Sequence, residues 1–216
     1  MFQEGQLKSL GIATGLIILN IAVMWIFAFT PLSAVNNLLF GTFLFLGVIV
    51  YGAMLTGGVW LAKKGVRNGS KPQAVAGTGL IQVAYGMFGA GIIGMLSASV
   101  QAAALGITGV VTTIIAVLSG LLVFGTSYDF SNWGRYANYI FLGVLAVSFI
   151  GSFSGIFGLI AFFLALIGFI VYLIHQIYMT KTRPNTPFLN GIGLYTAYMG
   201  VFVEILQLVV QMLIEE

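Results

Sequence analysis

Two ionisable side chains lie within apolar stretches of this sequence and could do chemistry there. His175, the sole histidine, lies in VYLIHQIYMTKTRP, and Glu204 lies in GVFVEILQLV. An embedded histidine predicts either an interfacial side chain hydrogen-bonded to a carbonyl or headgroup, or a proton-sensitive gate, because imidazole titrates near about pH 6.5. An embedded glutamate predicts either a neutral carboxyl bonded to a neighbouring helix, or a cation or proton site. We therefore take both residues as candidates for an ion pathway or gate.

The two candidates are expected at different depths in a membrane. At about 1.5 Å of rise per helical residue, His175 lies about 6 Å and Glu204 about 21 Å from the same end of their expected helices. The sequence therefore predicts that these two side chains do not touch.

Other chemistries lack the residues they need. The chain has no cysteine, which excludes thiolate nucleophiles and cysteine-bound metals, and one histidine, which excludes two-histidine metal sites. GSFSG at 151–155 is similar to an intramembrane serine protease motif, but Ser152 stands where that motif has glycine, two residues before Ser154. Asp129 has no second acid near it for an aspartyl pair. We expect no enzyme, no metal and no cofactor, and the net charge of +3 is too small to indicate nucleic acid.

The elements that position the two candidates are expected to be membrane-spanning helices. Of the 216 residues, 60% are hydrophobic and 6% are charged, whereas about 25% are charged in a soluble domain. A helix of about 20 apolar residues crosses a hydrocarbon core and satisfies its own backbone amides there. The sequence predicts an all-α integral membrane protein, a single-domain bundle of seven transmembrane helices over residues 1–216. The expected spans are 10–29, 38–62, 73–95, 101–124, 135–153, 157–179 and 190–213.

The cationic residues predict the orientation of the bundle. With seven spans, all the Lys and Arg residues fall at one end, whereas six or eight spans break this partition. The positive-inside rule then places the N-terminus in the cytoplasm and the Glu215–Glu216 tail on the opposite side of a cell membrane. The basic residues are Lys8, Lys63, Lys64, Arg67, Lys71, Arg135, Lys181 and Arg183.

Glycine and amide residues within the spans predict contacts between helices. GMFGAGIIG at 86–94 gathers small residues on one span, which indicates a packing seam between helices or, alternatively, a flexible helix that lines a pore. Asn20 and Gln82 are embedded amides, which are typical of interhelical hydrogen bonds.

Three motifs in the second half of the chain occur in the order and spacing of a known family. They are YDFSNWG at 128–134, FIVYLIHQI at 169–177 and GLYTAYMGVFVEILQLV at 193–209. By these motifs the chain resembles the transmembrane Bax inhibitor motif family. The resemblance implies a seven-helix protein involved in calcium leak, in restraint of cell death or in membrane-protein quality control.

The resemblance also implies where a gate would lie. Many family members carry facing aspartates on the last two spans, which act as a pH-sensitive latch on the pore. This chain has Leu173 and Ala197 at the matching positions, and neither side chain titrates. His175 lies on a different helix face from Leu173, whereas Glu204 lies two turns beyond Ala197 on about the same face. Glu204 is therefore the better candidate for an acid that faces the pathway.

Two functions follow from these observations. The first is a leak for cations, either calcium or protons, that lacks the usual pair of latch acids. The second is a non-conducting interaction or regulatory subunit of a membrane protein complex, such as a quality-control complex, that binds through glycine-rich helix faces. A small-molecule transporter is disfavoured because the two halves show no inverted repeat. The expected partners are the lipid bilayer, calcium or protons, and a membrane protein complex.

Overall fold

The protein is a bundle of long helices. The computed structural model describes residues 3–42 and 44–215, and Glu216, part of the tail assigned to the far side of the membrane, lies outside them. Seven of the helices are long and apolar enough to cross a membrane, so the predicted all-α, seven-helix membrane protein is confirmed. The elements are α1 (Glu4–Ala28), η1 (Pro31–Ala34), α2 (Val35–Thr42), α3 (Leu44–Arg67), α4 (Lys71–Ile93), α5 (Ala98–Gly125), α6 (Trp133–Gly151), α7 (Gly155–Thr182) and α8 (Pro187–Glu215).

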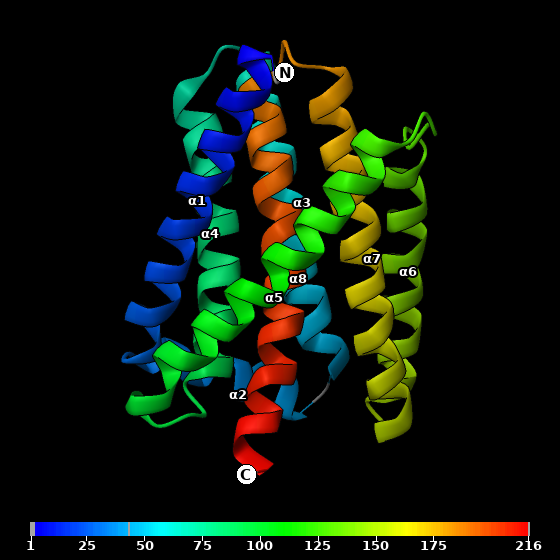
Figure 1. The fold of residues 1–216 in the computed structure, drawn as a ribbon. Coiled ribbons are helices and arrows are strands. Elements are labelled where there is room, and N and C mark those ends of the chain that lie inside the picture. Colours follow the sequence, from blue (N-terminus) through cyan, green and yellow to red (C-terminus); the bar gives the residue numbers. More distant parts are fainter. Residues whose placement is uncertain (1–2, 43, 216) are drawn as a thin grey trace.

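Helices α4 and α8 form the centre of the bundle. In their most apolar segments 67% and 61% of residues are buried, against 17–22% in the other five spans. Helix α8 packs against α1, α3, α4, α5 and α7, and the N- and C-terminal ends lie at opposite ends of the bundle (Figure 1). The fully buried Tyr195, Phe202 and Leu206 of α8 belong to one apolar core with Tyr85 and Met24. The other five helices leave most of their apolar surface exposed on the outside of the bundle, where lipid can cover it.

The basic residues gather at the end of the bundle where α1, α4, α6 and α8 begin. Lys64 and Arg67 lie in the last turn of α3, and Lys181 lies in the last turn of α7. Cations at the C-terminus of a helix are stabilised by its dipole. Helix α3 therefore continues to Arg67, beyond the expected limit at 62. We call this end of the bundle the basic end.

The second expected span, 38–62, differs most from the structure. Its first residues belong to the short helix α2, and the long helix α3 begins only at Leu44. Asn36 of α2 donates through Nδ2 to Phe88 O of α4 at 2.7 Å and accepts from the Tyr51 hydroxyl of α3. These buried bonds hold α2 against α3 and α4 instead of in line with α3.

Two predicted contacts between helices are present. Asn20 of α1 donates to Gln82 Oε1 of α4 at 2.6 Å, and Gln82 Nε2 donates to Leu16 O at 2.9 Å. The 86–94 run packs on α1, because a Cβ at Gly86 would lie 2.7 Å from Val23 Cγ1. The glycines of this run therefore form a packing seam within the chain.

Candidate functional site

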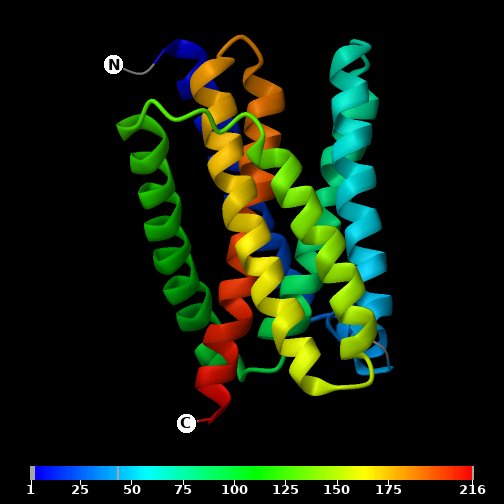
Figure 2. The ribbon, with the colours of Figure 1, turned by 90° about the vertical axis from the view of Figure 1, so that its right-hand side faces the viewer.

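A cavity of about 1420 Å³ lies between two helical hairpins. The hairpin of α3 and α4 forms one wall, the hairpin of α6 and α7 forms the other, and α8 lies behind them. In Figure 2, α3 and α6 approach each other at the end opposite the basic end and diverge towards the basic end. The walls formed by α3 and α6 are therefore farther apart at the basic end, and we call the part of the cavity that Lys63 and Arg135 line there its mouth.

At the end opposite the basic end, the start of α3 is in contact with the end of α6. The backbone N–H of Phe45 donates to Ser152 Oγ at 3.2 Å, and the rings of Phe45 and Phe149 meet edge to face with centroids 5.3 Å apart. An edge-to-face pair of this kind contributes about 0.5–1.5 kcal/mol beyond its burial. These contacts hold the two hairpins together at the end opposite the basic end.

The walls of the cavity are mostly apolar, with polar groups at particular levels. On α3, one helix face supplies Gly52, Thr56, Val59 and Lys63 at the three- and four-residue spacing of neighbours on a helix. On α7, Phe169 and Tyr172 continue the apolar lining on the facing wall.

Glu204 lies deep in this cavity and is its buried acid. Its side chain is 7% exposed, and it lines the cavity from α8 one turn before Gln207. Within the described part of the chain, no side chain or backbone group makes a hydrogen bond or ion pair with the Glu204 carboxyl. The alternative of a carboxyl bonded to a neighbouring helix is therefore not what the structure has. A buried polar group usually finds a partner, and one that faces a cavity without a partner is a functional candidate.

His175 lines the same cavity but is held by the backbone. Its Nδ1 lies 3.1 Å from Phe130 O, and because a carbonyl only accepts, Nδ1 carries the proton and donates. The imidazole stacks on the Tyr172 ring with centroids 6.5 Å apart, and Nε2 lies beside Gly134. This contact with a backbone carbonyl is the first of the two alternatives predicted for His175.

The Phe130 carbonyl is positioned by an ordered loop between α5 and α6. The Asp129 carboxylate accepts the backbone N–H of Ser131 at 2.8 Å. This hydrogen bond, with a smaller contribution from the Tyr178 hydroxyl, holds the pKa of Asp129 below its ordinary value of 3.8. The ring of Phe130 packs against Trp133 with centroids 4.9 Å apart.

His175 and Glu204 line the same cavity but lie at different depths along the bundle axis. Helix α7 extends to Thr182 and α8 starts at Pro187, so both residues lie deeper than the expected spans suggest. At about 1.5 Å per residue, His175 lies about 10 Å and Glu204 about 26 Å from the basic ends of their helices. The two groups are thus about 15 Å apart along the bundle axis.

The two positions that match the latch aspartates of the resembled family are both in the apolar core. Leu173 is 2% exposed and Ala197 is 0% exposed, and both belong to the main core cluster where α7 packs against α8. Neither side chain lines the cavity. The seam between α7 and α8 at these two positions is therefore sealed by packing.

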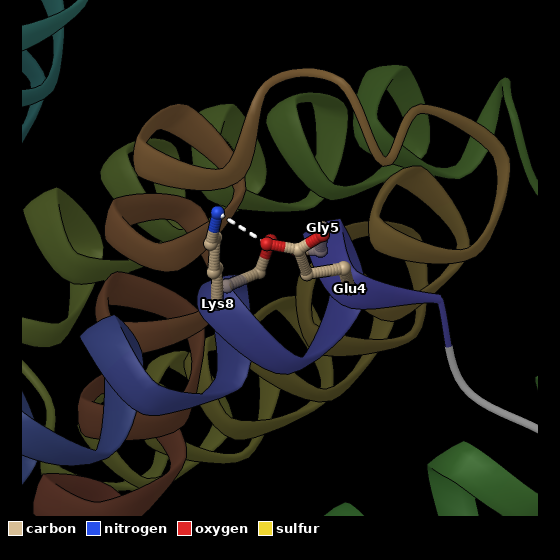
Figure 3. Close-up of polar contacts among 4 residues, drawn as sticks. Glu4, Gly5 and Lys8 are labelled. Atoms are coloured by element: carbon tan, nitrogen blue, oxygen red, sulfur yellow. Dashed lines mark hydrogen bonds and ion pairs between the residues drawn. The ribbon is translucent and has the colours of Figure 1, made fainter.

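Lys63 and Arg135 line the mouth of the cavity, and sequence reasoning assigned neither to a site. Lys63 is half-buried on α3 and Arg135 is exposed on α6. In the described residues the ion pair present is between Lys8 Nζ and Glu4 Oε1 at 2.7 Å (Figure 3), so neither mouth cation has an acidic partner. Continuing the α3 helix through its basic residues would have shown that Lys63 shares a face with Thr56.

The described residues contain no group of three or more His, Cys, Asp or Glu side chains placed to hold a metal ion. Comparison of the chain with protein-family models, curated proteins and solved structures finds no match.

Proposed function

We propose that this seven-helix membrane protein conducts cations through the cavity between its two hairpins, with Glu204 as the acid of the pathway. The observation that carries the proposal is a buried carboxyl on the wall of a large cavity, with no hydrogen-bond or ion-pair partner in the part of the chain that the structure describes. An ionisable group in a membrane protein is costly unless it faces water or a partner. A water-filled cavity satisfies the carboxyl of Glu204 and gives a cation a binding group inside the membrane.

The charges at the cavity mouth favour protons over calcium as the cation. Lys63 and Arg135 line the mouth of the cavity, and neither has an acidic partner among the described residues. A divalent cation that enters there meets two like charges before it reaches Glu204. A proton carries half the charge of a calcium ion, so the same two cations repel it half as strongly.

The resemblance to the transmembrane Bax inhibitor motif family supports the leak proposal. Its three motifs fall on the loop before α6 with the first residues of that helix, on the middle of α7, and on 193–209 of α8. All three helices line the cavity, and α8 carries Glu204. Since Leu173 and Ala197 replace the latch acids, the pH response of this protein differs from that of latch-bearing members. We propose that the chain is a divergent relative of that family.

Flux measurements in proteoliposomes test the leak. Vesicles that contain the wild-type protein should release protons, followed by an internal pH dye, faster than empty vesicles. Glu204→Gln, which removes the acid and keeps the size of the side chain, should lower that rate. Glu4→Gln is the matched control, because Glu4 is an exposed acid outside the cavity. Wild-type proton and calcium fluxes no greater than those of empty vesicles, between about pH 6 and 8, contradict the proposal.

A second candidate function is that of an interaction subunit. Gly11 and Gly15 lie four residues apart on α1, both are exposed, and a Cβ at either would meet nothing within 4 Å. Small residues at this spacing allow a second helix to approach closely in a membrane. The 86–94 glycines, by contrast, already pack within the chain.

Purification in mild detergent separates this function from the leak. A stoichiometric partner that is lost in Gly11→Leu/Gly15→Leu favours the interaction subunit. Gly143→Leu is the control, because a Cβ there also meets open space but lies on α6. A lone monomer that conducts favours the leak.

We propose that the basic end faces the cytoplasm, as the positive-inside rule requires. The chain has no cysteine, so single-cysteine variants give unambiguous labelling. Ser70→Cys and Thr182→Cys should react from the same side, and Ser97→Cys from the other. Labelling of Ser70→Cys and Thr182→Cys from opposite sides contradicts the seven-span orientation.

We also propose that the protein is not an enzyme. Ser154 immediately precedes the α7 helix and His175 lies near its other end, about 31 Å away at about 1.5 Å per residue. A serine and a histidine at that separation do not form a nucleophile and base.

A further inference from the structure

The mouth of the cavity carries two cations that nothing in the described chain neutralises. Lys63 lies four residues from the end of α3 and Arg135 lies two residues from the start of α6. At about 1.5 Å per residue they lie about 6 Å and 3 Å from their helix ends. They come from the two hairpins that diverge at this end, so they flank the opening from opposite walls.

Aromatic side chains place this opening at the level of lipid headgroups. Trp60 is 59% exposed on α3, and Lys64 Nζ lies 4.8 Å above its ring. Tyr128, Tyr136 and Tyr139 are exposed on and beside the start of α6. Belts of Trp and Tyr mark the boundary between hydrocarbon and headgroups. The two mouth cations therefore lie where lipid phosphates are.

Beyond the mouth, the cavity opens sideways towards the hydrocarbon of the membrane. Leu142 of α6 and Leu159 of α7 line it and are 61% and 58% exposed. Gly52 and Ala53 of α3 also line it and are exposed. An apolar crevice with exposed edges in a lipid-facing surface is open to acyl chains.

We propose that this crevice binds one anionic phospholipid, with its phosphate between Lys63 and Arg135 and an acyl chain along the apolar walls. The phosphate supplies the negative charge that both cations lack, and Arg135 offers a planar fork of donors for it. Asn132 and Asn138 line the mouth and supply amide groups for the rest of the headgroup. The volume of about 1420 Å³ exceeds the roughly 300–1,000 Å³ of pockets for small ligands. It therefore leaves room for an acyl chain along the exposed outer walls and for water beside the buried Glu204.

A lipid fits these features better than a free anion does. A free phosphate would pair with the cations but leave the apolar length of the crevice unfilled. A phospholipid satisfies the charge and the apolar walls together, and it is already at the correct depth. The proposal does not rest on cation conduction, because it concerns the mouth and outer walls and not Glu204.

Lipid retention by the purified protein tests the proposal. Wild-type protein in mixed micelles of phosphatidylglycerol and phosphatidylcholine with identical chains should retain phosphatidylglycerol preferentially, as measured by native mass spectrometry. Lys63→Gln/Arg135→Gln should reduce the preference about fivefold per cation, hence roughly 25-fold. Arg67→Gln/Lys71→Gln is the matched control, because both residues are exposed at the same end but do not line the cavity.

A second pair of variants tests the acyl-chain part of the site. Gly52→Leu places a side chain in the crevice without a collision, because a Cβ at Gly52 meets nothing within 4 Å. It should reduce retention of both lipids, whereas Gly57→Leu on the same helix, also in open space and outside the cavity, should not.

Three results would overturn the lipid site. One is a wild-type protein that retains the two lipids equally. Another is an equal loss of preference in Arg67→Gln/Lys71→Gln, which would assign the effect to the general charge of that end. The third is unchanged retention in Gly52→Leu.

Discussion

The α3–α4 hairpin, which forms one wall of the cavity, depends on a close approach of two helix backbones. A Cβ at Gly77 of α4 would collide with the backbone N of Ala62 and with Gly58 O, both on α3. Backbone atoms do not rotate aside as a flexible side chain does. We therefore predict that Gly77→Ala pushes α3 and α4 apart and destabilises the protein. Gly79 is the matched control, because it is exposed on the same helix and a Cβ there meets nothing within 4 Å.

The magnitude follows from the difference between the two variants. Alanine replaces glycine in a helix in both cases, so the gain in helix propensity of about 0.8–1 kcal/mol is common to them and cancels. What remains is the cost of overpacking at Gly77, about 1–3 kcal/mol. At about 2–4 °C per kcal/mol for a chain of this size, Gly77→Ala should melt about 2–12 °C below Gly79→Ala.

The measurement is thermal unfolding of both variants in the same detergent, followed by circular dichroism. Gly79→Ala should melt at or above the wild-type temperature, and Gly77→Ala below it. Equal melting temperatures for the two variants would refute the close approach of α3 and α4. A lower melting temperature for Gly79→Ala than for Gly77→Ala would show that exposed helix positions, and not the seam, limit stability.

Two further predictions concern polar contacts. In a double-mutant cycle of Asn20→Leu and Gln82→Leu, the unfolding free energies should show a coupling of about 0.6–1.7 kcal/mol, and strict additivity would contradict the bond between α1 and α4. For Asp129, whose carboxylate accepts the N–H of Ser131, the folded-state pKa lies below the ordinary 3.8, so its stabilisation is complete above that pH. Asp129→Ala should therefore melt below wild type at neutral pH, and the difference should vanish as the pH falls through the folded-state pKa. A difference that grows on acidification would contradict this.

The number of spanning helices follows from the sequence because lipid imposes a simple rule. Each crossing needs a long apolar helix, so hydropathy and the partition of Lys and Arg suffice. That Asn20 and Gln82 each make a hydrogen bond to a neighbouring helix was predictable for a related reason, since an embedded amide needs a partner, but their pairing with each other comes from the structure. These features depend on local composition or on a single pairing.

The cavity was not predictable, because it depends on how far two hairpins diverge. The α3 and α6 helices meet where Phe45 contacts Ser152, and they diverge towards the basic end. Neither residue has a feature in the sequence that marks it as a contact. The short helix α2 was missed for the same reason, since the bonds of Asn36 to two other helices are long-range.

The acid and the mouth cations of the cavity are far enough apart to act separately. Lys63 lies about 6 Å and Glu204 about 26 Å from the basic end, so about 20 Å separates their levels. At an effective dielectric constant of about 20, two unit charges at that distance interact by about 0.8 kcal/mol. In a water-filled cavity the interaction is weaker still, because the Debye length is about 8 Å at physiological salt. By the same arithmetic Arg135, about 3 Å from its helix end, contributes about 0.7 kcal/mol, so the two cations together contribute at most about 1.5 kcal/mol. Neutralising both should therefore reduce the lipid preference roughly 25-fold while changing proton flux through Glu204 by less than about 13-fold, the factor that 1.5 kcal/mol represents. A change in flux as large as that caused by Glu204→Gln would mean that the lipid and the acid belong to a single coupled site.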